Sequence, residues 1–259
     1  MTRAVRILDV EVDAVTLEQA VAMIGEAVDA HGGHGATTFQ VATVNPEFVM
    51  SAQKDPEFSK VLELADLCLA DGTGVVWAAR RQGCELGGPV PGVDLIPPLA
   101  ALCARRGFRL FLLGAAPGVA AELAARLRTE HAGLEVAAHS GSPEHSSDEE
   151  TLRLIHEHRA QVLLVAFGAP KQDLWIARLR DRLGVSVAIG VGCVFDLIAG
   201  RSRRAPRWMQ QAGLEWAYRA AREPRRLLGR YLTDALWLVP ITAGVVRMRL
   251  AARQLVEPA

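Results

Sequence analysis

The stretch AQVLLVAFGAPKQDLWIARLRDRL, residues 160–183, decides the fold. It begins as an apolar run, turns at Gly-Ala-Pro (168–170), and continues with apolar residues at helical spacing. A short apolar run that ends in turn residues is typical of a strand buried on both faces, and the segment after it is typical of a helix that packs back on a sheet. This unit predicts an α/β protein with a mostly parallel sheet.

The same unit recurs along the chain, so we predict a Rossmann-like α/β fold: a mostly parallel sheet with flanking helices. Strands are predicted at 38–44, 67–70, 108–114, 134–140, 160–168 and 185–192. Helices are predicted at 18–30, 46–55, 118–131, 147–160 and 171–183. Asn45-Pro46 predicts a cap followed by proline in the first helical turn, and Ser147 with Glu150 predicts a capping box.

The composition excludes several classes of protein. The 259 residues are 50% hydrophobic, which is ample for a continuous core. Because 29 basic residues balance 29 acidic ones, no overall charge attracts nucleic acid, and we expect no nucleic-acid partner. Four cysteines without metal-ligand spacing and a first twenty residues without a long apolar run favour a cytoplasmic protein.

The charge is nevertheless segregated. Nine arginines fall between positions 201 and 230, opposed there only by Glu215 and Glu223. We therefore predict two parts, an α/β core of residues 1–200 and a helical, arginine-rich C-terminal appendage of residues 201–259. A guanidinium group donates two parallel hydrogen bonds to a phosphate and stays charged at any working pH. The natural partner of this arginine cluster is therefore a diphosphate substrate or an anionic lipid headgroup.

The appendage also contains an apolar run, ALWLVPITAGVV (235–246), which is too short to span a membrane. With arginines at 230, 247 and 249 beside it, the run suits the interface of the inner membrane surface, where Trp237 would lie at headgroup depth. It also suits a helix that packs on the core or on a second copy in a homo-oligomer. The sequence leaves these alternatives open.

Candidate site residues follow the predicted strands, because ligands of open parallel sheets bind beyond the carboxyl ends of strands. Thr43 and Asn45 lie on one side of a strand end, where they can hydrogen-bond a sugar or a base edge, although Asn45 also suits a plain helix cap. Asp71 places a carboxylate at the next strand end, and Gly72 lets a ligand approach the backbone. Turn chemistry alone also explains Asp-Gly.

Two further loops have the same position. Gly114 and Gly118 bracket a loop that opens a helix, where backbone amides can hold a phosphate. Their spacing is not that of the dinucleotide-binding fingerprint, which counts against a nicotinamide oxidoreductase. Lys171 and Gln172 fall in the first turn of the next predicted helix, where an exposed Gln beside a Lys suits a sugar or phosphate clamp.

The sequence contains no paired aspartates of the D-x-D type, no phosphate-binding P-loop and no metalloprotease or serine-hydrolase motif. We therefore expect no metal site and no cofactor. The arginines of the appendage are the available source of positive charge against a phosphate.

In combination these motifs resemble the WecG/TagA/CpsF family of bacterial glycosyltransferases, over roughly residues 38–231. The segments that carry the resemblance are TVNPEFV (43–49), LADGTGVVWAAR (69–80), PGVDL (91–95), FLLGAAPGVA (111–120), VAFGAPKQDLWI (165–176), IGVGCVFDLIAG (189–200), RAPRWMQQAGLEWAYR (204–219) and EPRRLLGRYL (223–232).

The resemblance implies an inverting, metal-independent transfer of a sugar, N-acetylmannosamine or a relative, from a UDP-sugar to a prenyl-diphosphate-linked sugar at the inner face of the plasma membrane. By motif, Asp71 would be the general base. Thr43 and Asn45 would position the sugar, and Gln172 would line the same pocket. The charge of the departing UDP would be neutralised by Arg219, Arg226 and Arg230.

This chain departs from the usual family pattern at several positions. It has Asp173 where Glu usually follows Gln172, Val90 where Arg is frequent, and Gly229 where another arginine often stands. The loop change at Val90 suits a different donor sugar, Asp173 is a tolerable change, and Gly229 leaves open which tail arginines act. A non-catalytic nucleotide-sugar-binding protein of the same fold remains the alternative, because fold alone does not fix function.

Overall fold

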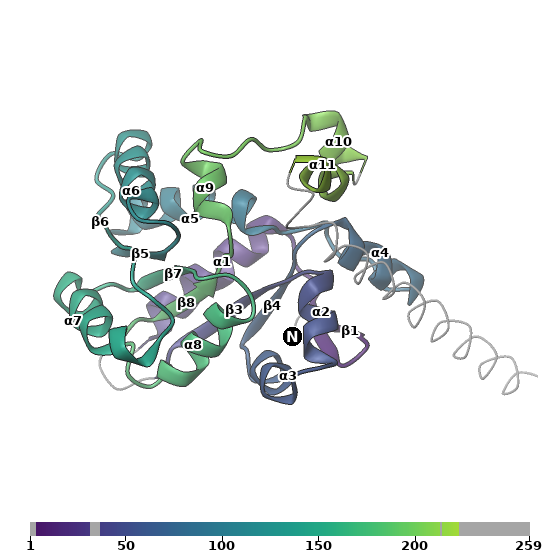
Figure 1. Ribbon diagram of the computed structural model, residues 1–259, viewed down its shortest axis with the longest axis horizontal. Coiled ribbons are helices and arrows are strands. Elements are labelled where there is room, and N and C mark those ends of the chain that lie inside the picture. Colours follow the sequence, from purple (N-terminus) through teal and green to yellow (C-terminus); the bar gives the residue numbers. More distant parts are fainter. Residues whose placement is uncertain (1–3, 32–36, 213, 223–259) are drawn as a thin grey trace, which may run out of the picture.

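The computed structural model describes residues 4–31, 37–212 and 214–222, and its centre is a parallel sheet of six strands (Figure 1). The strand order is β4-β3-β8-β7-β5-β6, and every neighbouring pair is parallel. The strands are β3 (Phe39–Val44), β4 (Leu67–Ala70), β5 (Leu110–Gly114), β6 (Val136–His139), β7 (Val162–Ala166) and β8 (Val187–Gly190). Each lies within a predicted range, so the Rossmann-like α/β class is confirmed.

Helices cover both faces of the sheet. Four of them, α1 (Leu17–Ala30), α5 (Gly92–Arg106), α6 (Val119–Glu130) and α9 (Val194–Ile198), pack on one face. The other face carries α2 (Pro46–Ala52), α3 (Pro56–Glu63), α7 (Asp148–His158) and α8 (Lys171–Leu179). In β7 alternate residues enter opposite cores, since Val162 and Leu164 face α1 and its neighbours while Leu163 and Val165 face α7 and α8. Double burial explains the uninterrupted apolar runs.

An antiparallel hairpin, which the sequence patterns do not predict, precedes the sheet. It consists of β1 (Ala4–Ile7) and β2 (Val10–Asp13). Asp13 Oδ2 accepts a hydrogen bond of 2.8 Å from the backbone amide of Cys68 in β4. The hairpin is thereby attached to β4, one of the two edge strands of the sheet, and gives one of its edge amides a partner.

Helix boundaries follow the caps closely but not everywhere. Asn45 caps α2 and Pro46 occupies its first turn, as predicted. The predicted capping box at Ser147 is wrong, because Ser147 is the last residue of a 3₁₀ turn (His145–Ser147) and its side chain makes no cap bond. The predicted helix 46–55 ends at Ala52, and α3 begins after Asp55. Two helices without a prediction, α4 (Thr73–Arg81) and α5, follow the Asp71 loop.

Beyond α9 the chain forms two short helices, α10 (Arg207–Gln211) and α11 (Glu215–Arg222) (Figure 1). Arg204 attaches this segment to the core. Its guanidinium donates to both carboxylate oxygens of Asp94 in the first turn of α5, and Nε donates to Glu215 of α11 at 3.2 Å. Arg201 forms a second attachment, with two bonds to Glu122 of α6 at 2.8 and 2.5 Å.

Arg226, Arg230 and the apolar run 235–246 lie outside the described residues. Within the described part of the chain, no helix has both the length and the apolar character that crossing a membrane requires.

A buried carboxylate joins α7 to α8. Asp148, at the start of α7, is 4% exposed and accepts hydrogen bonds from Trp175 Nε1 (2.9 Å) and from the Arg178 guanidinium of α8. Burial pushes the pKa of this carboxyl upward, but the bonds from Arg178 and Trp175 and the charge of Arg178 outweigh burial and hold the pKa below its ordinary value.

We predict that Asp148→Asn lowers the free energy of unfolding by roughly 2 kcal/mol at pH 7, less than for a fully buried pair because Arg178 is 29% exposed. A lowered pKa means that the stabilisation is present above the ordinary carboxyl pKa and is lost as pH falls through the lowered value. Urea denaturation at pH 7 and pH 3 measures this. The control is Glu149→Gln, which removes only an exposed pair with Arg182 and should leave the free energy of unfolding nearly unchanged. An equal loss for Asp148→Asn at both pH values would contradict the account.

Candidate active site at the carboxyl edge of the sheet

The strand register brings the predicted site loops together. β3 and β4 run in parallel with Thr43 opposite Leu69 and Val44 opposite Ala70. The backbone amide of Asp71 then donates to the carbonyl of Val44 at 2.7 Å. Asn45 and Asp71, the first residues after two adjacent strands, therefore lie at neighbouring positions on the carboxyl edge of the sheet.

Asp71 is half-buried at the end of a buried strand, and Gly72 turns the chain into α4. Gly72 has a φ of +94°, a conformation that strains any residue with a side chain. The glycine thus has a conformational reason for being there, and no side chain at this position separates Asp71 from a ligand.

The side chains of Thr43 and Asn45 both form hydrogen bonds with the backbone. The Thr43 side chain is buried, and its hydroxyl donates to the carbonyl of Gly190 at 2.7 Å, which ties β3 to β8. Asn45 Oδ1 accepts from the amide of Phe48 at 3.1 Å, as a helix cap does. That bond uses the carbonyl end of the side chain, and the amide nitrogen at the other end is a donor of two N–H groups.

Gln172 is not the exposed clamp that the sequence suggests, since it is only 1% exposed. Its Oε1 accepts two backbone hydrogen bonds, from Gly168 at 3.1 Å and from Gly192 at 2.9 Å. Gly168 follows β7 and Gly192 follows β8, so one side-chain oxygen joins the loops of two adjacent strands. The helices after these two strands pack on opposite faces of the sheet, α8 on one face and α9 on the other. Open parallel sheets form their ligand crevice between two such strands. Lys171, one residue before, is exposed at the start of α8.

The loop after β5 approaches β7 closely. Gly114 has a φ of +104°, and a Cβ there would lie 2.8 Å from the carbonyl carbon of Ala166. Packing between strand ends therefore requires this glycine. At Gly118, which begins α6, the Arg201 guanidinium lies 3.8 Å from the position of an added Cβ. A cation thus lies beside the helix start that the sequence suggested as a phosphate site, although Arg201 is also paired with Glu122.

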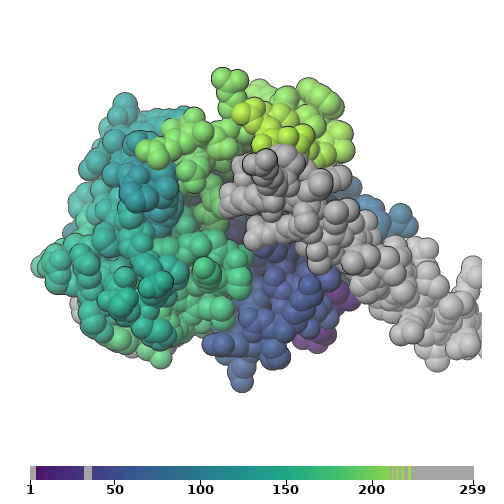
Figure 2. All heavy atoms as spheres, viewed as in Figure 1, coloured from purple at the N-terminus to yellow at the C-terminus, as the bar shows by residue number. Residues whose placement is uncertain are grey.

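Of the predicted tail arginines, Arg219 falls in α11, and Arg226 and Arg230 lie outside the described residues. The segment that contains Arg219 lies above α2 and α3 in the space-filling view (Figure 2). Its attachment through Arg204 is at the carboxyl edge, because Asp94 follows the loop in which Val90 donates to Ala70 at the end of β4.

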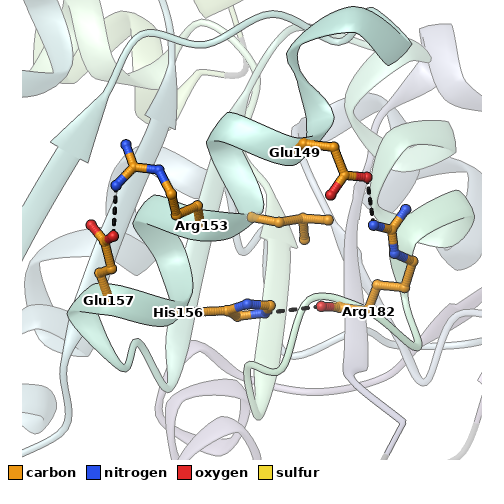
Figure 3. A pocket seen from close by; sticks show the side chains of 6 residues that line it. Glu149, Arg153, His156, Glu157 and Arg182 are labelled. Atoms are coloured by element: carbon orange, nitrogen blue, oxygen red, sulfur yellow. Dashed lines mark hydrogen bonds and ion pairs between the residues drawn. The ribbon is translucent and has the colours of Figure 1, made fainter.

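A surface hollow of about 350 Å³ elsewhere on the molecule lacks the features of a site. It is lined by α7 and by the turn before β8, near the amino ends of strands (Figure 3). Its charged groups pair with one another, Arg153 with Glu157 and Arg182 with Glu149, and His156 Nε2 contacts the carbonyl of Arg182. These pairs leave no side chain aimed at a ligand in this hollow.

Asp173, which the sequence marks only as a replacement of the usual Glu after Gln172, is a buried carboxyl. Its exposed fraction is 0%, and neither carboxyl oxygen has a hydrogen-bond partner among the described residues. Burial raises the pKa of the Asp173 carboxyl to about 7, while the Gln172 amide opposes part of that effect. No sequence pattern reveals this burial, because acidic residues in a first helical turn are ordinary.

Fold and site geometry together define an α/β protein with a candidate ligand site at the loops after β3, β4, β5, β7 and β8. Residues 5–254 match the glycosyl transferase WecG/TagA/CpsF family, and the chain belongs to that family of glycosyltransferases.

Two curated relatives carry the same description, N-acetylglucosaminyldiphosphoundecaprenol N-acetyl-beta-D-mannosaminyltransferase. The protein from Bacillus spizizenii is 33% identical over 202 residues, which cover 76% of this chain and 78% of the relative. The protein from Bacillus subtilis is 31% identical over 188 residues, which cover 72% of each.

The pKa of Asp173 yields a prediction of opposite sign to that for Asp148. The pKa of Asp173 is about 7 in the folded protein and 3.8 for an ordinary carboxyl. Between these pH values the Asp173 carboxyl is therefore protonated in the folded chain and ionised in the unfolded chain. The stability contributed by Asp173 therefore falls by about 1.4 kcal/mol per pH unit between those values and stays low above pH 7. Asp173→Asn carries no such charge, so its stability relative to the parent should rise from pH 4 to pH 7 and then level off. Urea denaturation across this range tests it, and a difference independent of pH would refute a buried ionisable Asp173.

Proposed function

We propose that this chain transfers N-acetylmannosamine, or a related hexose or uronic acid, from a UDP-sugar to a prenyl-diphosphate-linked saccharide, as a step in cell-surface glycopolymer synthesis. The descriptions of the two Bacillus relatives support this acceptor class and this sugar. The observation that carries the proposal is the position of Asp71, a half-buried carboxylate at the edge where ligands of parallel sheets bind.

The reaction we propose is a single inverting displacement without a metal ion. The acceptor hydroxyl oxygen attacks the anomeric carbon from the face opposite UDP, and the bond from that carbon to the diphosphate oxygen breaks. Asp71 accepts the hydroxyl proton, and UDP leaves with the bonding electron pair. A single base and a stabilised leaving group suffice for this displacement.

The other site residues bind and orient the donor. The amide N–H donors of Asn45 hydrogen-bond the sugar, and Thr43 aligns β3 with β8 beneath it. Gly72 and Gly114 allow close approach of the backbone, and Lys171 adds an exposed charge at the start of α8. Gln172 shapes the pocket by joining two of its loops.

Residues 201–259 act as an appendage whose arginines close over the diphosphate. Arg219, Arg226 and Arg230 neutralise the departing UDP, whereas Arg201 and Arg204 attach the segment to the core. The same part of the chain contacts the inner membrane surface. Trp208 (64% exposed) and Leu214 (38% exposed) belong to the same segment as the exposed Arg203 and Arg207, a combination that suits lipid headgroups.

Asp71→Asn should reduce transfer by about 10²–10⁴-fold, because it removes the base while keeping the side-chain shape. Binding of the UDP-sugar, measured by calorimetry, should change less than about threefold, since the base acts on the acceptor. Glu85→Gln, an exposed carboxyl in the loop between α4 and α5, serves as the matched control and should leave both quantities unaltered. Full activity in Asp71→Asn, or loss of its fold by circular dichroism, would remove Asp71 as the base.

Arg226→Gln and Arg230→Gln should each lower kcat by about 10²-fold with the core still folded, the usual cost of losing one group that stabilises a leaving anion. Lysine at the same positions should restore part of the rate, because it keeps the charge without the paired donors. Arg105→Gln, at an exposed position of α5, is the control for general loss of positive charge and should leave kcat unchanged. Unchanged kcat in both glutamine variants would show that these arginines do not act on the diphosphate.

A further inference from the structure

The side chains of Asp173 and Gln172 both lie beside Gly190, at the end of β8. A Cβ on Gly190 would lie 2.6 Å from Asp173 Oδ1 and 2.7 Å from Gln172 Nε2. The carboxyl and the amide nitrogen are therefore neighbours in the space that a side chain at position 190 would fill. The absence of a side chain at Gly190 is what allows both to approach the end of β8.

The two ends of the Gln172 amide face different partners. Two N–H donors, from Gly168 and Gly192, point at Oε1. Nε2 and the carboxyl oxygen Oδ1 of Asp173, which has no hydrogen-bond partner among the described residues, both lie within 2.7 Å of the position that a Cβ on Gly190 would take. If the Gln172 amide were rotated by 180°, Nε2 would face the two N–H donors of Gly168 and Gly192, and Oε1 would face the Asp173 carboxyl. Both contacts would then be repulsive. Both environments select the same orientation, the one in which Gln172 accepts from both loops.

We infer that Asp173 is a positioning residue of the transferase site, whose buried carboxyl acts through Gln172 to hold the loops after β7 and β8 in place. The inference rests on the proposed function only in assigning these loops to the substrate site. The contacts among Asp173, Gln172, Gly168 and Gly192 are independent of what is bound.

The charge state of Asp173 makes the inference testable by pH. The groups that face it from the packed elements are Gly190 of β8, the Gln40 amide of β3, which donates to the Asp173 carbonyl, and the Cys68 thiol of β4. Burial and then the neighbouring carboxylates raise the pKa of Cys68, so that the thiol stays neutral. With the pKa of Asp173 at about 7, the carboxyl is neutral at pH 6 and ionised at pH 8. An ionised carboxylate without a partner favours local opening that admits water.

Hydrogen exchange of the full chain measures the two loop amides directly. In the parent protein, the protection factors of Gly168 and Gly192, corrected for intrinsic rates, should fall by about tenfold from pH 6 to pH 8, the equivalent of one pKa unit. In Asp173→Asn they should not change with pH. Asp181→Asn, an exposed aspartate in the turn after α8, should behave as the parent does.

Kinetics supplies the second readout. Asp173→Ala should lower kcat/KM by about tenfold at pH 6 because Gln172 loses the carboxyl at the amide-nitrogen end of its side chain. Asp173→Asn should recover most of that loss and should lack the decline of kcat/KM above pH 7 that the parent shows.

The two sets of data separate the failure of the inference from the failure of the proposed function. Protection factors that do not change with pH in the parent, or that change equally in Asp173→Asn, overturn the positioning role whatever the activity. Loop protection that follows Asp173 while no UDP-sugar is turned over supports the positioning of the loops and contradicts the transferase assignment.

Discussion

Burial of the sheet on both faces is the constraint on which the rest of the molecule depends. Strand side chains such as Val162, Leu163, Leu164 and Val165 are all fully buried, so none of them can reach a ligand. Polar chemistry is thereby confined to the ends of the strands, and parallel pairing brings those ends to a common edge. The placement of Asn45, Asp71 and Gln172 on this edge follows from the way the core is built.

The parts of the fold set by local pattern could be predicted from the sequence. All six sheet strands are apolar runs that end in turn residues, and Asn45-Pro46 is a cap that tertiary contacts do not alter. The β1–β2 hairpin escapes prediction because its turn contains Leu8 at a φ of +52°, where a glycine or asparagine would have given the usual signal. Helix α5 escapes prediction because it contains Pro97 and Pro98, and proline is unfavourable in the interior of a helix.

The candidate site shows the same division between local and distant contacts. The sequence places Gln172 in the first turn of a helix, but its burial depends on Gly168 and Gly192, which belong to loops after two different strands. The burial of Asp173 likewise depends on Gly190. For the arginines, clustering in sequence indicates an anionic partner, yet the structure assigns Arg201 and Arg204 to carboxylates of α6 and α5. Contacts between residues far apart in the sequence are needed to tell which arginines attach the segment to the core and which are left to bind a ligand.

The most direct measurement of the central claim is the release of UDP from a panel of UDP-sugars, with N-acetylmannosamine, glucose and glucuronic acid as the sugars. The assay contains a soluble prenyl-diphosphate-linked N-acetylglucosamine analogue and excess EDTA. The account predicts release from one donor that depends on the acceptor, is insensitive to EDTA and yields a product of inverted anomeric configuration. Folded protein that binds UDP but releases none from any donor, or release that EDTA abolishes, would contradict it.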